Sequence, residues 1–218
     1  MTIAQRIDQI RSFIPSHVRL IAVTKQVPTE AMREAYQAGI RDFAENRLQE
    51  ALVKQEQLQD LPDLCWHFIG HLQSNKAKKV LESFEWIHSV DSLELLQRLD
   101  RLAKELSNVP RICLQVKVLP DPNKYGWPIP EFLQDIPQIE KCCQLKIQGL
   151  MTILPLGLNE AEIKAAFETT RKLALQVNGQ SQLEIRELSM GMSDDYQWAV
   201  GEGATMIRLG RILFGERA

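Results

Sequence analysis

Short apolar runs alternate with longer amphipathic segments along almost the whole chain. Residues 18–25 (VRLIAVTK) are typical of a buried strand, and residues 29–39 (TEAMREAYQAG) have the period of a helix that ends at a glycine. The pattern predicts strands at 18–25, 41–46, 64–70, 86–91, 111–118, 145–153, 185–191 and 205–210. Between them, it predicts helices at 29–39, 47–59, 73–84, 92–107, 129–143, 160–177 and 193–203.

This strand-then-helix order is typical of a parallel sheet, because parallel neighbours need a crossover and a helix supplies it. Eight units of this size predict a compact α/β fold, the (β/α)8 barrel, with a doubly wound open sheet as the alternative. The chain contains no low-complexity linker and no internal repeat. We therefore expect a single domain over residues 1–218.

The composition narrows the possible partners. A formal charge of −2 argues against a nucleic-acid binder with a broad basic surface. No apolar stretch approaches the roughly 20 residues of a membrane helix, and the N-terminus lacks the apolar core of a secretory signal. The cysteines lack metal-site spacing and are interpreted as reduced thiols. These features predict a cytoplasmic protein without a membrane or nucleic-acid partner.

A lysine is an unusual residue at the end of the first predicted strand. Functional side chains of a barrel lie at the C-terminal ends of its strands. Because side chains alternate along a strand, Ile21, Val23 and Lys25 share one face. Burying an unpaired lysine charge is costly. The Lys25 amine therefore either extends to the barrel rim or attacks an aldehyde to form a Schiff base.

Two glycine turns follow the last two predicted strands. Ser189 supplies a hydroxyl, and Gly191 lets the backbone approach a ligand closely. Gly210 and the Arg211 amide form the second turn. Ser193 is expected to cap the following helix, whose free amides and dipole favour an anion. Since barrels frequently bind phosphate after strands seven and eight, the two turns predict a phosphate site.

Several motifs, in order along the chain, resemble those of the pyridoxal phosphate homeostasis proteins. They are AVTK, ENRLQE, WHFIGHLQSNK, HSVDS, LSMGMSDD and IRLGRILFG. They extend over nearly the whole chain, and HFIGHLQSNK and LSMGMS are highly specific. The resemblance implies a barrel like the N-terminal domain of alanine racemase and like that of eukaryotic ornithine decarboxylase. It also implies pyridoxal 5'-phosphate as the cofactor.

By this resemblance Lys25 carries the cofactor as a Schiff base. The other site residues that it implies are Ser189, Gly191, Gly210 and Arg211 around the phosphate, and Asn46, Met151 and Arg208 around the ring. The chain departs from the family in having Ala44 where glycine is frequent, which changes little. It also departs at Arg211, where a small residue is common and the larger side chain either adds charge near the phosphate or projects outward.

The chemistry of arginine adds to this picture. Arg208 stays protonated, so it cannot accept a proton from the pyridine nitrogen that the family arginine faces. It should keep that nitrogen unprotonated and so weaken the ring as an electron sink. A salt bridge from Arg208 to a carboxylate inside the barrel, such as Glu187, is the structural alternative.

The same resemblance bears on catalysis. A two-base racemase needs a proton donor opposite Lys25, which related racemases take from a second, β-rich domain across a dimer interface. The sequence ends soon after Gly210, so we expect no such domain and a monomer. We therefore expect a non-catalytic protein of vitamin B6 and amino-acid homeostasis, which binds pyridoxal phosphate and hands it to apo-enzymes.

Two enzymatic alternatives stay open. One is a weak pyridoxal-phosphate-dependent racemase that uses Tyr125. The other is a cofactor-free aldolase in which Glu45 or Asp91 transfers protons, although Glu45 is more simply a salt-bridge partner and Asp91 a helix cap. His67 and His71 straddle the end of a strand, so we expect no metal site.

Overall fold

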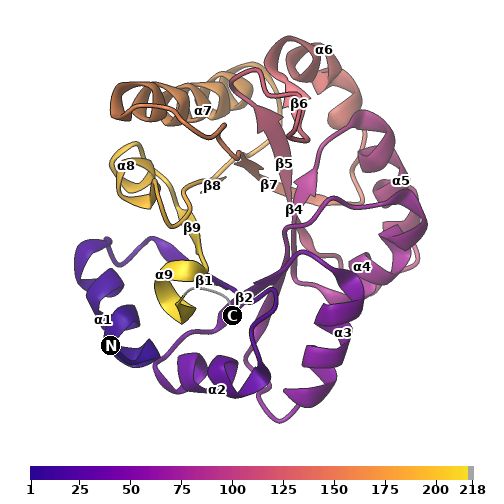
Figure 1. Ribbon diagram of the computed structural model, residues 1–218. Helices are drawn as coiled ribbons and strands as arrows, with labels where there is room; N and C mark the ends of the chain where they lie inside the picture. Colours follow the sequence, from indigo (N-terminus) through magenta and orange to yellow (C-terminus); the bar gives the residue numbers. More distant parts are fainter. Residues whose placement is uncertain (216–218) are drawn as a thin grey trace.

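Eight parallel strands close into a barrel in the computed structural model, which describes residues 1–215 (Figure 1). Around the barrel the strands follow the order β1, β2, β3, β4, β5, β7, β8 and β9, and pairs β4–β5 and β1–β9 complete the circle. Their bounds are β1 Arg19–Val23, β2 Asp42–Glu45, β3 Cys65–Phe68, β4 Trp86–Val90, β5 Arg111–Lys117, β7 Lys146–Met151, β8 Glu187–Ser189 and β9 Met206–Leu209. The predicted (β/α)8 barrel is confirmed, and the open-sheet alternative is wrong.

Helices surround the barrel on its outside (Figure 1). They are α1 Ile3–Phe13, α2 Thr29–Gln37, α3 Leu48–Gln57, η1 Ser74–Lys76, α4 Ala77–Ser83, α5 Leu93–Ala103, α6 Ile129–Ile139, α7 Glu160–Gln180, α8 Tyr196–Gly201 and α9 Arg211–Phe214. A two-residue strand, β6 Trp127–Pro128, pairs with β5 outside the barrel and was not predicted. Within residues 1–215, every helix is too short or too polar to cross a membrane.

Two helix starts differ from the sequence expectations. Ser92, and not Asp91, is the N-cap of α5, and its hydroxyl accepts a hydrogen bond from the Leu95 amide. The expected cap at Ser193 is also wrong, because α8 starts at Tyr196 after the N-cap Asp195. Residues 193–195 instead form a turn that leads into a helix of only six residues.

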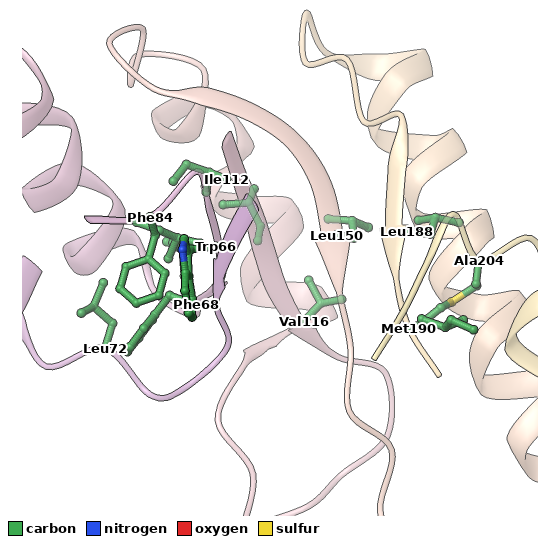
Figure 2. Packing of buried hydrophobic residues seen from close by; sticks show 14 of the residues in the cluster. Trp66, Phe68, Leu72, Phe84, Ile112, Val116, Leu150, Leu188, Met190 and Ala204 are labelled. Carbon is green, nitrogen blue, oxygen red and sulfur yellow. The ribbon is translucent and has the colours of Figure 1, made fainter. Parts of the chain in front are cut away.

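The strands bury two separate layers of side chains. Alternate residues point outward and pack against the helices, where Phe68 and Phe84 meet edge to face with ring centroids 5.2 Å apart (Figure 2). The other residues point into the barrel and form a small cluster of Ile21, Val23, Ala44, Trp86, Cys113, Met151 and Met206. Since Ile21 and Val23 point inward, the residues after them are directed toward the C-terminal mouth of the barrel.

Candidate functional site

Lys25 lies in a tight turn directly after β1. The side chain is half-buried, and the next residue, Gln26, has a φ of +60°, a conformation that non-glycine residues rarely adopt. The turn is tied to α3, because the Gln26 amide donates a 2.6 Å hydrogen bond to the Glu50 carboxylate. The fold therefore presents Lys25 from a turn whose backbone is held on its outer side.

A buried ion pair supports this turn from behind. The Lys54 ammonium donates to the Thr24 carbonyl at 2.7 Å and to the Glu45 and Glu50 carboxylates at 2.8 and 2.7 Å. The Thr24 hydroxyl donates to the same Glu45 oxygen at 2.6 Å. Burial raises the pKa of Glu45, against the hydrogen bonds from Lys54 and Thr24 that lower it. The expectation that Glu45 is a salt-bridge partner is confirmed.

The two glycine turns lie side by side because their strands are neighbours. β8 pairs with β9 through Ser189 and Met206, and β9 pairs with β1 through Arg208 and Ile21. The turn after β8, the turn after β9 and the turn that carries Lys25 therefore follow three adjacent strands. The structure brings together the residues that the sequence suggested for a phosphate and a Schiff-base lysine.

Each glycine of these turns has a different structural reason. Gly191 has a φ of +93°, and a Cβ there would lie 2.7 Å from the Cβ of Ala199 in α8. Only glycine lets α8 pack this closely on the turn. A Cβ at Gly210 would lie 3.3 Å from the Val23 carbonyl oxygen, so the turn after β9 also approaches β1 tightly.

The Arg211 side chain projects outward and joins the two turns. Its guanidinium donates a 2.6 Å hydrogen bond to the Asp194 carboxylate, and both side chains are largely exposed. This geometry decides between the two orientations left open by the sequence.

Arg208 is buried inside the barrel, just below the turns. Its guanidinium donates to the Ser189 carbonyl at 2.6 Å, to the Ser189 hydroxyl at 2.7 Å and to the Thr152 carbonyl at 2.9 Å. Burial lowers the pKa of Arg208 to about 10, so it stays protonated at neutral pH. The alternative of a salt bridge to Glu187 is wrong, because Glu187 instead accepts a 2.5 Å hydrogen bond from Thr205.

Asn46 and Met151 complete the inner wall. Met151 is fully buried in the inner cluster and pairs in register with Ser189. Asn46 follows β2, and its Oδ1 is buried without a hydrogen-bond partner among the described residues. An unsatisfied buried oxygen costs about 1–3 kcal/mol, so it marks a place where a bound group with a donor is favoured.

Comparison with known proteins identifies the family. The sequence pattern of the alanine racemase N-terminal domain matches residues 1–218. The pyridoxal phosphate homeostasis protein of Synechocystis sp. is 54% identical over 210 residues, which cover 96% of this chain and 96% of that protein. The chain belongs to the pyridoxal phosphate homeostasis protein family. The member from Escherichia coli K12 is 36% identical, and the match covers 93% of this chain and 87% of that protein.

Solved structures of family relatives agree with this assignment. PipY of Synechococcus elongatus PCC7942, described without pyridoxal phosphate and with it bound, superposes with a TM-score of 0.95 at 55% and 53% identity. The match covers 98% of this chain and 100% of PipY. Alanine racemase of Clostridium difficile 630 shares the fold with a TM-score of 0.79 at 15% identity, over 99% of this chain and 57% of the racemase. The resemblance in the sequence is thereby confirmed.

Two sets of contacts at the C-terminal mouth and inside the barrel were not predicted. At the C-terminal rim, the Tyr125 ring stacks on His71 with centroids 3.8 Å apart, and His71 Nδ1 lies 3.3 Å from the Asp91 carboxylate. Inside the barrel, His88 Nδ1 lies 2.8 Å from the Ser189 hydroxyl. The signal for His88 was its inward parity in β4, two residues after Trp86, but its partner on β8 depends on the closed barrel.

Proposed function

We propose that this protein binds pyridoxal 5'-phosphate as a Schiff base on Lys25 and serves pyridoxal phosphate homeostasis without catalysing a reaction of its own. The observation that carries the proposal is the convergence of three adjacent strand ends, which bring Lys25, two glycine turns and a buried arginine to one mouth of the barrel. The bound form of PipY, a relative 53% identical to this chain, supports it.

Each residue of the mouth has a defined part in this proposal. Pyridoxal phosphate supplies an aldehyde that condenses with an amine, with loss of water. Lys25 supplies the amine, and the turns at Gly191 and at Gly210 and Arg211 bind the phosphate through backbone amides. Asn46 and Met151 line the ring, and the unsatisfied Asn46 Oδ1 fits a polar group of the cofactor.

Arg208 and Ser189 act as one unit in the proposal. Ser189 is fully buried one layer below the turns, and its hydroxyl accepts from Arg208. We therefore assign Ser189 to the site through Arg208. A protonated Arg208 has only donors, so it cannot accept a hydrogen bond from a protonated pyridine nitrogen and favours the unprotonated ring, which withdraws electrons more weakly. This chemistry suits a protein that holds the cofactor more than one that transforms amino acids with it.

The wider role follows the same reasoning. We propose a cytoplasmic monomer that hands pyridoxal phosphate to apo-enzymes. The four cysteines are all unpaired, although Cys142 and Cys143 are adjacent and Cys143 is exposed, which suits a reducing compartment. Size-exclusion chromatography with light scattering tests the monomer, and a dimer would contradict it.

An absorption experiment tests the central claim. Protein incubated with pyridoxal phosphate and freed of excess should absorb in the near-visible region, and borohydride should remove the band and fix the cofactor mass on the Lys25 peptide. Lys25→Ala should abolish both results. Lys117→Ala is the matched control, because Lys117 is a half-buried lysine at the end of β5 and should retain both.

A second measurement separates the carrier from the racemase. The loaded protein is incubated with L-alanine, and the D-enantiomer is followed by chiral chromatography. No D-alanine above the level of Lys25→Ala supports the carrier. Lys25-dependent formation of D-alanine would establish the racemase, and a wild type without any absorption band would favour the cofactor-free aldolase.

A further inference from the structure

A continuous chain of hydrogen bonds runs through the interior of the barrel. Asp42 Oδ1 lies 3.0 Å from His67 Nε2, His67 Nδ1 lies 2.9 Å from His88 Nε2, and His88 Nδ1 lies 2.8 Å from the Ser189 oxygen. Arg208 Nη1 donates to that same oxygen at 2.7 Å. Asp42 is the first residue of β2 and Ser189 the last of β8, so the chain connects the N-terminal mouth with the candidate site.

Burial keeps both imidazoles of this chain neutral. His67 and His88 are fully buried. Desolvation lowers the pKa of His67, although the hydrogen bond and charge of Asp42 oppose the shift. Desolvation also lowers the pKa of His88 well below its usual value, with His67 and Arg208 adding repulsion. At neutral pH each ring therefore carries one N–H, and the question is on which nitrogen.

The Asp42 end determines the position of the first proton. The Arg19 guanidinium lies 3.5 Å from the same Asp42 oxygen and forms an ion pair with the carboxylate. A bare nitrogen 3.0 Å from that carboxylate would set lone pair against lone pair. His67 must therefore carry its proton on Nε2, and its Nδ1 is left as an acceptor.

The remaining bonds follow from this first proton. His88 Nε2 must donate to the bare His67 Nδ1, which leaves His88 Nδ1 as an acceptor. The Ser189 hydroxyl then donates to His88 Nδ1, and its oxygen accepts from Arg208. Each hydrogen bond between Ser189 and Asp42 then has one donor and one acceptor, and all of them donate in the same direction, from Ser189 toward Asp42.

We propose that Asp42, His67 and His88 are positioning residues that fix Ser189 as an acceptor and thereby hold the Arg208 guanidinium in place. An alternative tautomer of His88 would aim its own N–H at the Ser189 oxygen, so the Ser189 hydroxyl would lose its acceptor and would no longer be held in one orientation toward Arg208. A charged carboxylate at one mouth of the barrel thus sets the arrangement of an arginine near the other mouth. The direction of these hydrogen bonds is a property of the protein without cofactor, whereas their effect on cofactor binding rests on the proposed function.

Nitrogen-15 NMR of histidine-labelled protein tests the direction without any cofactor. We expect both His67 and His88 to be neutral with the proton on Nε2 at neutral pH, as read from long-range couplings between ring carbon-bound protons and the two nitrogens. A proton on Nδ1 of either ring, or a doubly protonated ring, would overturn the proposal. This measurement uses the wild-type protein and therefore does not depend on how a variant folds.

Variants of Asp42 test whether the carboxylate sets the direction. Asp42→Ala removes the acceptor and should leave His67 and His88 as mixtures of tautomers. Asp42→Asn retains an acceptor oxygen and should preserve the Nε2–H forms. Asp63→Asn is the control, since Asp63 is an exposed carboxylate paired with Arg41 and should change neither ring. Unchanged His88 signals in folded Asp42→Ala would contradict the role of Asp42.

Variants of His88 test the effect on the site. His88→Phe deprives the Ser189 hydroxyl of its acceptor, and we expect pyridoxal phosphate to bind about tenfold more weakly, which corresponds to roughly one hydrogen bond. His88→Asn offers an oxygen near the position of Nδ1 and should restore most of the affinity. Equal weakening by both variants would overturn the positioning role, whereas a wild type that binds no pyridoxal phosphate would refute the proposed function and leave the NMR result standing.

Discussion

The outward and inward faces of the same eight strands have opposite characters. The outward face is packed with aliphatic and aromatic side chains against the helices, as around Phe43 and Phe132. The inward face has a small apolar cluster, and the buried polar groups His67, His88 and Arg208 lie among its members. The comparison indicates that apolar burial in the outer layer supplies most of the folding stability. The inner layer has less apolar packing because polar groups of the site occupy part of it.

The largest effect is expected in the outer layer. Phe43→Ala removes a fully buried ring and should lower the free energy of unfolding by about 3–5 kcal/mol. Phe13→Ala is the matched control, because Phe13 is 64% exposed at the end of α1, and should change stability by less than about 0.5 kcal/mol. Urea titration measures both. If Phe43→Ala stays folded, its pyridoxal phosphate affinity should equal that of the wild type. A large loss of affinity would contradict the separate roles of the two layers.

Loss of the buried lysine behind the Lys25 turn is expected to come next. Lys54→Met leaves the buried Glu45 without its cationic partner, so we expect a loss of about 3 kcal/mol. We also expect weaker cofactor binding, because the Thr24 carbonyl loses its donor. Lys78→Met removes an exposed ion pair with Glu105 and should have little effect. Thermal unfolding and cofactor titration give the two readouts. Equal behaviour of the two variants would show that the buried pair does not support the turn.

A pair of glycines with similar backbone angles sharpens the comparison at the site. Gly191→Ala and Gly157→Ala both place a side chain at positive φ, +93° and +82°, but only the first meets another atom, the Ala199 Cβ at 2.7 Å. Gly191→Ala should therefore lose about 1–3 kcal/mol more than Gly157→Ala. It should also weaken pyridoxal phosphate binding. Equal losses in urea unfolding would mean that α8 moves aside freely.

The smallest expected effect is the pH dependence of stability that the inner-layer histidines cause. The pKa values of His67 and His88 are lowered on folding, so the unfolded chain binds more protons below its own histidine pKa of about 6.5. This stability is present above that pH and is lost as the pH falls below it. The slope is up to about 1.4 kcal/mol per pH unit for each ring. Glu45, whose pKa is raised, acts in the opposite sense.

His88→Asn isolates the histidine contribution. Because Asn cannot titrate, the variant should lose less stability than the wild type between about pH 6.5 and pH 5. Urea unfolding at a series of pH values, compared as the difference between the two proteins, removes the Glu45 effect that they share. Parallel curves would mean that His88 is protonated in the folded protein.

The sequence could predict those features that depend on one segment at a time. Periodicity located the eight strands, and strand parity directed Arg208 toward the barrel interior. The prediction failed where competing local groups decide the geometry. Asp91 and Ser92 are both possible caps, as are Ser193 and Asp195, and residue type alone does not choose between two neighbouring candidates.

Contacts between distant strands were beyond such reasoning. The chain from Asp42 through His67 and His88 to Ser189 crosses from β2 to β8, and it requires both the register of β2 to β4 and the closure of the barrel. The outward course of the Arg211 side chain likewise depends on Asp194, which follows a different strand. Parity shows that a polar residue points inward, but not which residue it meets.

One thiol makes the inner layer observable. Cys113 is a fully buried member of the inner cluster. Burial both shields its thiol from reagents and raises its pKa, which keeps it out of the reactive thiolate form. Cys143, in contrast, is exposed and available to an alkylating reagent in the folded protein. Mass spectrometry of alkylated protein can therefore use Cys143 as an internal standard. The rate at which Cys113 is modified then reports how often the barrel opens.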